Sequence, residues 1–161
     1  MMDIKRTAKF GWIYPESQHF DDMKLLTKDK YNRYTLTRIK VWVGEKDDRV
    51  VIQGIQSFFK DIQTGEEITE GERRDSQTPF TSTHEFKLEN NEYIVDFIIR
   101  FETEVTEIGF VTNKGRTEKW GGQAGELKNT HLTGAGKMVR GIFGYHSDVL
   151  TNLGVLYTDA V

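Results

Sequence analysis

Side chains that alternate with a period of two restrict the fold of this chain more than any other feature. In residues 35–43 (TLTRIKVWV), Thr, Ile and Val fill one set of alternate positions, and Leu, Arg, Lys and Trp fill the other. This alternation is typical of β-strands. Comparable runs occupy residues 50–59, 92–101, 106–112, 137–143 and 151–157, with turn-like clusters of Gly, Asn and Asp between them. The chain is therefore predicted to be all-β, with many short strands and little helix.

Three of these runs share a local pattern of Thr, any residue, Ile or Leu, any residue, then Val or Phe. The pattern occurs at Thr37–Val41, Thr106–Phe110 and Thr151–Val155. It is good strand sequence in its own right, and three copies also suggest three related sheets. We expect the apolar members of each copy to face a common core: Ile39, Val41, Ile108, Phe110, Leu153 and Val155.

Length and composition predict one domain over residues 1–161 and exclude several partners. The net charge of −3 offers no basic field for a nucleic acid, and no apolar run approaches the roughly 18 residues of a membrane span. Cysteine is absent, which excludes disulfides and zinc–thiolate sites. Because residues 1–10 lack the apolar core of a secretory signal and no Asn-x-Ser/Thr sequence occurs, we expect a cytoplasmic protein.

Several short motifs contain residue types found in active sites, but none has the spacing that catalysis requires. His146–Asp148 has the residue types of a catalytic triad, yet adjacent residues of a strand point to opposite faces. Gly134–Met138 lacks two defining residues of a phosphate-binding loop. Asp21–Asp22 is assigned a structural hydrogen-bonding role and Arg73–Arg74 a place on the solvated surface. The sequence thus predicts a binding module and not an enzyme, with no catalytic residue, metal or cofactor.

The N-terminal segment, residues 1–14, has apolar groups on both faces. Phe10, Trp12 and Tyr14 alternate with Gly11 and Ile13. As a free tail, such a segment would leave these apolar side chains exposed to water. We expect it to form a strand or extension that pairs with its own sheet or with a partner.

A series of short segments resembles the jacalin-related lectin domain in order and spacing. These segments are Phe20–Asp22, Thr37–Val43, Phe86–Leu88, Glu92–Ile94, Ile108–Asn113, Trp120–Gly122, Gly141–Gly144 and Leu153–Val155. Together they extend over most of the chain. The resemblance implies a β-prism of three Greek-key, four-stranded sheets with pseudo-threefold symmetry.

The same resemblance implies a sugar site in loops at one end of the prism. A carboxylate and backbone N–H groups would bind the sugar hydroxyls, and glycines would let the backbone approach the ring. The residues expected there are Trp120, Gly121, Gly122, Gln123, Gly144, Tyr145, His146, Ser147, Asp148 and Thr151. Trp120 is the aromatic residue best placed to stack on a sugar ring.

Two elements of the family's sugar site are altered in this chain. The family's sugar loop reads Gly-x-x-x-Asp, and Ser147 and Thr151 stand at its glycine and aspartate positions. Residues 16–19 (ESQH) replace a glycine pair, whereas Gly121–Gly122 is retained. Asp148 lies in the same loop, and we expect it to supply a displaced carboxylate. Two functions therefore remain open: a glycan-binding module that departs from ordinary mannose-type binding, or a structural, protein-interacting subunit of a larger assembly whose sugar site is lost.

Overall fold

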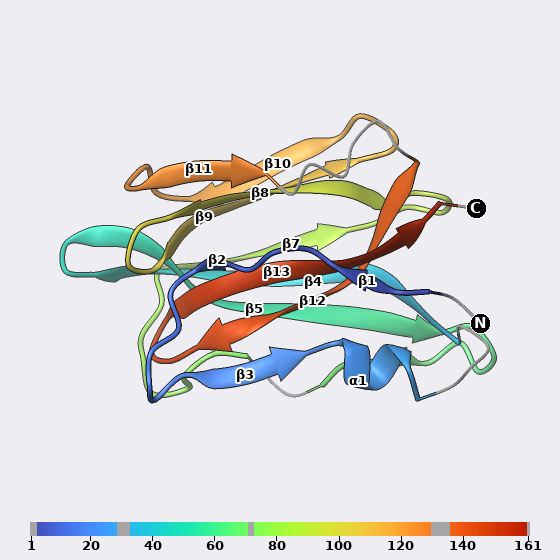
Figure 1. Cartoon of the computed structure of the whole chain (residues 1–161), viewed down its shortest axis with the longest axis horizontal. Coiled ribbons are helices and arrows are strands. Elements are labelled where there is room, and N and C mark those ends of the chain that lie inside the picture. Colours follow the sequence, from blue (N-terminus) through green and yellow to red (C-terminus); the bar gives the residue numbers. More distant parts are fainter. Residues whose placement is uncertain (1–2, 29–32, 71–72, 130–135, 161) are drawn as a thin grey trace.

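The structure consists of three antiparallel sheets (Figure 1). One core of buried apolar side chains lies between them. The computed structural model describes residues 3–28, 33–70, 73–129 and 136–160. This part of the chain contains thirteen strands and one short helix, α1 (Met23–Leu26). The prediction of an all-β chain with three sheets and little helix is confirmed.

A long hairpin forms the centre of each sheet. The paired strands are β4 (Tyr34–Lys46) with β5 (Arg49–Asp61), β8 (Ile94–Phe101) with β9 (Val105–Thr112), and β12 (Lys137–His146) with β13 (Leu150–Asp159). β-Branched and aromatic residues are frequent in these strands, which accounts for their extended conformation. The first hairpin turns through Asp47 and Asp48, whose φ angles of 52° and 62° are those that a type I′ turn requires.

Shorter strands complete two of the sheets in the same order. β6 (Glu67–Ile68) pairs with β5, and β7 (Ser82–Lys87) returns to pair with β4. β10 (Thr117–Gly121) pairs with β9, and β11 (Glu126–Asn129) returns to pair with β8. In both sheets the fourth strand lies beside the first, which is the Greek-key arrangement.

The third sheet is built from both ends of the described chain. β3 (Gln18–Asp21) pairs with β12, while β1 (Lys5–Arg6) and β2 (Phe10–Gly11) lie one after the other along the edge of β13. Five strands therefore make a sheet that is four strands wide. The N-terminal segment also covers the outer face of this sheet, where the Arg6 guanidinium lies 4.9 Å from the centre of the Phe143 ring.

β-Bulges reveal the threefold repeat most clearly. In the first strand of each hairpin, one extra residue interrupts the pairing; these residues are Thr37, Val95 and Arg140. The second strand contains another bulge, with the extra residues Gln53, Thr106 and Thr151. In all three hairpins, five consecutive residue pairs separate the two bulges, at residues 38–42, 96–100 and 141–145 of the first strands.

The three sequence copies lie one in each sheet, as expected, but they do not all occupy equivalent strands. The copies at Thr106 and Thr151 do occupy equivalent second strands, and each begins at the bulge residue. The copy at Thr37–Val41 lies instead in β4, the first strand of its hairpin, and the strand equivalent to β9 and β13 is β5. Gln53 stands there in place of the threonine, so the local pattern does not mark β5.

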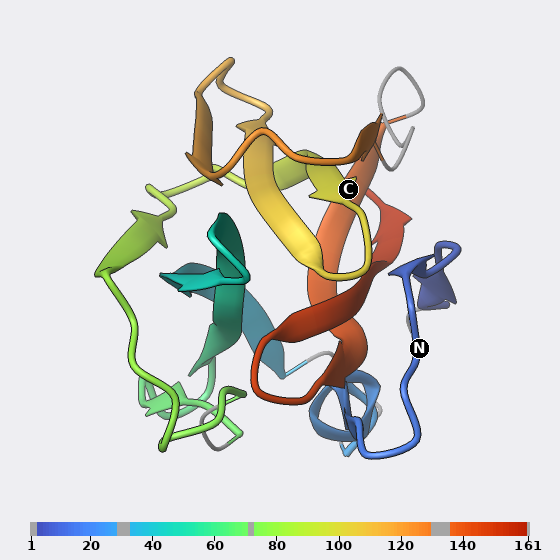
Figure 2. The ribbon, with the colours of Figure 1, turned by 90° about the vertical axis from the view of Figure 1, so that its left-hand side faces the viewer.

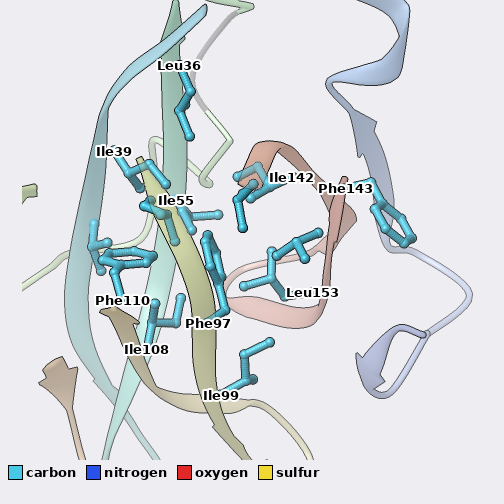
Figure 3. Close-up of a cluster of buried hydrophobic side chains, with 14 of the residues drawn as sticks. Leu36, Ile39, Ile55, Phe97, Ile99, Ile108, Phe110, Ile142, Phe143 and Leu153 are labelled. Carbon is cyan, nitrogen blue, oxygen red and sulfur yellow. The ribbon is translucent and has the colours of Figure 1, made fainter. Parts of the chain in front are cut away.

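Equivalent apolar side chains of the three hairpins converge in the core (Figure 3). All six residues expected in the core are fully buried: Ile39, Val41, Ile108, Phe110, Leu153 and Val155. Figure 3 also shows Phe143 on the opposite side of its sheet from Ile142 and Leu153, facing the N-terminal segment. Fully burying one such side chain contributes about 1.5–3 kcal/mol, so the core fixes the relative positions of the three hairpins.

Arg73 is buried, which corrects the expectation that Arg73–Arg74 lies on the solvated surface. The Arg73 guanidinium pairs with the carboxylate of Asp22, which is fully buried, and donates to Ser57 Oγ at 3.0 Å. Arg74 lies over the ring of Trp42, 5.3 Å from its centre. A local charge pattern cannot predict these contacts because the partners lie far away in the sequence. Asp22 has the structural role that was expected.

Candidate functional site

The tips of the three central hairpins meet at one end of the prism, here called the apical end (Figure 2). It consists of the loops Asp47–Asp48, Glu102–Glu104 and Ser147–Val149. The turn that precedes β3 adds residues 14–17 to this end, because the Tyr14 hydroxyl donates to the carbonyl of Thr103 at 2.9 Å. Residues from four distant parts of the sequence therefore share one surface.

Two clefts flank Ser147 and Asp148 at the apical end. The larger, called the Tyr14 cleft, has a volume of about 600 Å³ and is lined by Tyr14, Glu16, Lys46, Asp47, Thr103, Glu104, Ser147 and Asp148. The smaller, called the Arg74 cleft, has a volume of about 440 Å³ and is lined by Glu16, Gln18, Arg74, Asp75, Ser76, His146, Ser147 and Asp148. The β12–β13 loop thus forms the wall between the two clefts.

One oxygen of the Asp148 carboxylate is held by neighbouring donors. Oδ1 accepts hydrogen bonds from Ser147 Oγ at 3.0 Å and from Lys46 Nζ at 3.2 Å. Among the described residues, no hydrogen bond reaches Oδ2, and the side chain is 46% exposed. A fixed carboxylate with one free oxygen can accept a hydrogen bond from a ligand hydroxyl.

Ion pairs hold the floor of the Tyr14 cleft. Lys46 Nζ lies 3.7 Å from Glu104 Oε1, and Arg49 donates to Glu104 Oε2 at 2.6 Å and to Glu102 Oε2 at 3.1 Å. Burial opposes the charge of Lys46, but the neighbouring carboxylates of Asp148 and Glu104 outweigh it and raise the pKa of the lysine. Lys46 is therefore a stable cation that orients Asp148.

The Tyr14 ring is held in place by a turn and by its own hydroxyl. The Tyr14 N–H donates to Ser17 Oγ at 3.1 Å, and the Ser17 N–H donates to the Tyr14 carbonyl at 3.0 Å. Pro15 occupies the second position of this turn, which its fixed φ favours. Tyr14 is 36% exposed and lines the cleft. An exposed aromatic side chain fixed beside a carboxylate is a common feature of polar ligand sites.

The predicted residues Trp120, Gly121, Gly122 and Gln123 do not line either cleft. Trp120 lies in β10, where its ring stacks on His84 at 5.3 Å and contacts Phe86 and Phe110 edge to face. Gly121 packs closely on the Thr106 carbonyl and Gly122 on Val50, and the Gly122 N–H donates to the Thr106 carbonyl at 2.7 Å. The Gln123 amide donates to Glu107 Oε2 at 3.1 Å. This segment is engaged in packing against β9 and β7.

The other predicted residues, from the hairpin of β12 and β13, divide into two groups. His146, Ser147 and Asp148 line the clefts, and burial lowers the pKa of His146. Gly144 packs against the backbone of Asn152, and the Tyr145 ring contacts that of His19 at 4.8 Å. Those two residues therefore support the loop from within the sheet.

Thr151 is buried, with 1% of its surface exposed. Its hydroxyl donates to the carbonyl of Tyr145 at 3.3 Å, just as the equivalent hydroxyl of Thr106 donates to that of Arg100 at 3.2 Å. Its own carbonyl accepts a hydrogen bond from the Trp12 N–H at 2.9 Å. In this arrangement Thr151 stabilises a bulge and is not accessible to a ligand.

Sequence reasoning missed six residues of the Tyr14 cleft: Tyr14, Glu16, Lys46, Asp47, Thr103 and Glu104. One local signal could have indicated part of this cleft. The sequence Tyr14–Ser17 is typical of a turn, and it directly precedes the first segment that resembles the lectin family. Within the described ranges, no cluster of three or more His, Asp or Glu is arranged to hold a metal ion. The helix in these ranges is too short to cross a membrane.

Three Greek-key sheets around one core, with loops gathered at one end, define a β-prism. The model of the family described as the jacalin-like lectin domain matches residues 17–156. The chain therefore belongs to the jacalin-like lectin family, whose members are non-enzymatic carbohydrate-binding proteins. The interpretation of the chain as a binding module and not an enzyme agrees with this membership.

Solved structures share this fold at low sequence identity. A prostate-specific WGA16 glycoprotein lectin is 20% identical, covers 96% of this chain and 100% of its own, and superposes with a TM-score of 0.69. A mannose-binding jacalin-related lectin from Ananas comosus is 12% identical, with coverage of 97% and 98% and a TM-score of 0.70. Calystegia sepium agglutinin is 15% identical, with coverage of 99% and 97% and a TM-score of 0.71. Curated protein sequences give no match.

Proposed function

We propose that this chain is a lectin that binds glycans in the Tyr14 cleft, with Asp148 as the main acceptor of sugar hydroxyls. The observation that carries the proposal is the fixed Asp148 carboxylate with its free Oδ2 in a cleft of about 600 Å³. Tyr14 adds an aromatic surface for the apolar face of a sugar ring. Family membership supports the same function, and structural neighbours are described as mannose binding or as complexes with an N-glycan.

The charge of the cleft restricts the glycans that it would accept. Four carboxylates line it, those of Glu16, Asp47, Glu104 and Asp148, and among the described residues Lys46 is the one lysine or arginine in its lining. A sialylated or sulfated glycan would bring further negative charge to this surface, which costs binding free energy. We therefore expect neutral glycans to bind and acidic glycans to bind more weakly.

The test is a titration of the purified chain with methyl α-mannoside, methyl β-galactoside and lactose, followed by calorimetry or NMR, with sialyllactose as the acidic comparison. Asp148→Asn should weaken the binding of the preferred neutral sugar about ten- to a hundredfold, because a hydrogen bond to a charged acceptor is lost. Asp159→Asn is the matched control, since its side chain is 78% exposed and lines neither apical cleft. Equal affinities for the wild type and Asp148→Asn would exclude the proposed role of Asp148.

The alternative function, a protein-interacting subunit, is favoured by exposed apolar side chains beside the cleft. Trp12 and Ile13 are 59% and 51% exposed, although they directly precede Tyr14. If none of the sugars binds at millimolar concentration, Trp12→Ser should be compared with the wild type by light scattering. A change in oligomeric mass would support the interaction function, and an unchanged monomer would argue against self-assembly through this surface.

A further inference from the structure

A pocket separate from the two apical clefts lies at the end of the prism opposite the hairpin tips, and is here called the distal pocket. It has a volume of about 510 Å³. Its walls come from the beginning of β4, the end of β5, the loop between β7 and β8, and the first part of β12. Two of the bulge residues described above, Thr37 and Arg140, line it. Bulges often redirect a side chain toward a functional site.

Arg140 brings a cation into this pocket, and no carboxylate among the described residues pairs with it. Its Nε donates to Thr158 Oγ1 at 2.8 Å, which is a neutral acceptor, and no ion pair of Arg140 occurs within the described residues. The side chain is partly buried, and this burial lowers the pKa of the guanidinium. A desolvated guanidinium with unused N–H groups is a strong donor for a planar anion.

The other charged side chains of the pocket do not neutralise Arg140. Glu92 is already bound by Arg116, with 2.7 Å between Arg116 Nη2 and Glu92 Oε1, and Glu89 lies 3.6 Å from Lys114 Nζ. Lys60 also lines the pocket and has no ion pair within the described residues. Two cations and two carboxylates line the pocket, and both carboxylates pair with cations that lie outside the lining. Lys60 and Arg140 are therefore left without a carboxylate partner among the described residues.

Apolar side chains also line the pocket. Ile62 is 59% exposed although its backbone is fixed by a hydrogen bond from its N–H to the Arg33 carbonyl at 2.9 Å. Leu88, Met138 and the Tyr93 ring lie partly buried around the same space. An exposed isoleucine on a fixed backbone offers contact area to a ligand without a large ordering cost.

We propose that the distal pocket binds a small amphiphilic carboxylate, a molecule with one carboxylate on an aryl or alkyl body. The carboxylate would pair with the Nη atoms of Arg140, and Lys60 would add longer-range attraction. The body would cover Ile62 and Leu88. This site is independent of the proposed glycan site, because the two share no lining residue.

The test uses 4-phenylbutyrate as the probe and its neutral amide, 4-phenylbutyramide, as the isosteric control. Both are titrated into the ¹⁵N-labelled full chain. We expect the carboxylate to shift the amide signals of Ile62, Leu88 and Tyr93 together with the side-chain Nε–Hε signal of Arg140. The amide should bind at least tenfold more weakly. Inorganic phosphate, which has charge but no apolar body, should also bind at least tenfold more weakly.

Two variants separate this site from general charge effects. Arg140→Gln should weaken the binding of 4-phenylbutyrate at least tenfold while the fold is retained, as checked by the ¹⁵N spectrum. Arg6→Gln removes the same charge from an arginine that is paired with Asp21 and does not line the pocket, and it should leave binding unchanged. Equal binding of acid and amide, equal binding of phosphate, absence of binding, or unchanged binding in Arg140→Gln would each overturn the proposal.

Discussion

Two arginines lie near the bulge of β12, and they differ in whether a described carboxylate pairs with the guanidinium. Arg73 meets a fully buried carboxylate, Asp22, which also accepts hydrogen bonds from Ser57 Oγ at 2.6 Å and from the Ile142 N–H at 2.9 Å. Arg140, the bulge residue itself, meets only the Thr158 hydroxyl among the described residues. One arginine is balanced within the fold, whereas the other faces a pocket.

The comparison teaches how to distinguish a structural charge from a candidate binding group. A buried charge with a partner and with satisfied hydrogen bonds is stable in place, and removal of one member leaves the other uncompensated. A desolvated charge without a counter-ion lowers the stability of the fold, and a ligand that supplies the counter-ion would restore it. The two arginines should therefore respond in opposite directions to the same substitution.

The largest expected effect is that of Arg73→Met. This substitution leaves the Asp22 carboxylate buried without a cation, and such a loss costs about 3–5 kcal/mol in the free energy of unfolding. Urea unfolding at pH 7, followed by fluorescence, measures it. The double variant Asp22→Asn with Arg73→Met should be more stable than Arg73→Met alone, because the uncompensated charge is removed. A loss below about 1 kcal/mol in Arg73→Met would show that the buried pair is not structurally important.

An intermediate effect is expected for Glu92, the carboxylate that the distal pocket shares with Arg116. Burial works against its charge, but hydrogen bonds from Arg116, the Glu89 N–H and Thr112 dominate and lower its pKa to about 2. A lowered pKa stabilises the fold above the pKa of the unfolded state, and this stability is lost as the pH falls toward 2. Glu92→Gln should therefore be less stable by about 1–3 kcal/mol at pH 7.

The pH dependence of that difference is the sharper measurement. The stability gap between the wild type and Glu92→Gln should shrink between about pH 4.5 and pH 2, as the wild-type carboxyl becomes protonated. Glu126→Gln is the control, because the Glu126 side chain is 64% exposed and pairs with Lys128 on the same strand. A gap that stays constant across this range would mean that the hydrogen bonds of Glu92 do not depend on its charge.

Much of the fold could be predicted from the sequence, because the alternation of apolar and polar residues along a strand is a local signal, and it also indicates which face is buried. The long hairpin strands carry both, so their positions and buried faces were predictable. β1, β2 and β6 have two residues each, too few to show a period. Gln53 shows a different limit: it occupies the same bulge position as Thr106 and Thr151, but the position constrains backbone geometry more than residue type.

The candidate sites were less predictable because their residues come together only in three dimensions. Ser147 and Asp148 were identified from their loop, but Tyr14 reaches the same cleft from the turn before β3, and Lys46 reaches it from β4 of another sheet. Trp120 precedes two glycines and reads as a loop residue, yet it packs on Phe86 and Phe110. The distal pocket had no sequence signal, since an unpaired Arg140 is visible only once its neighbours are known.

The smallest expected effect, and the one that decides the comparison, is that of Arg140→Met. Methionine retains the apolar length of the side chain and removes a partly desolvated cation, so the free energy of unfolding should stay the same or rise by up to about 1 kcal/mol. For a chain of this size that corresponds to about 2–4 °C in Tm, which calorimetry at pH 7 resolves.

Arg6→Met is the control. Because Arg6 is 41% exposed and ion-paired, this substitution should change the stability by less than about 0.5 kcal/mol. A loss of more than about 1 kcal/mol in Arg140→Met would place Arg140 with Arg73 as a structural residue. A gain in stability together with lost affinity for 4-phenylbutyrate would identify Arg140 as a group kept for binding at the expense of stability.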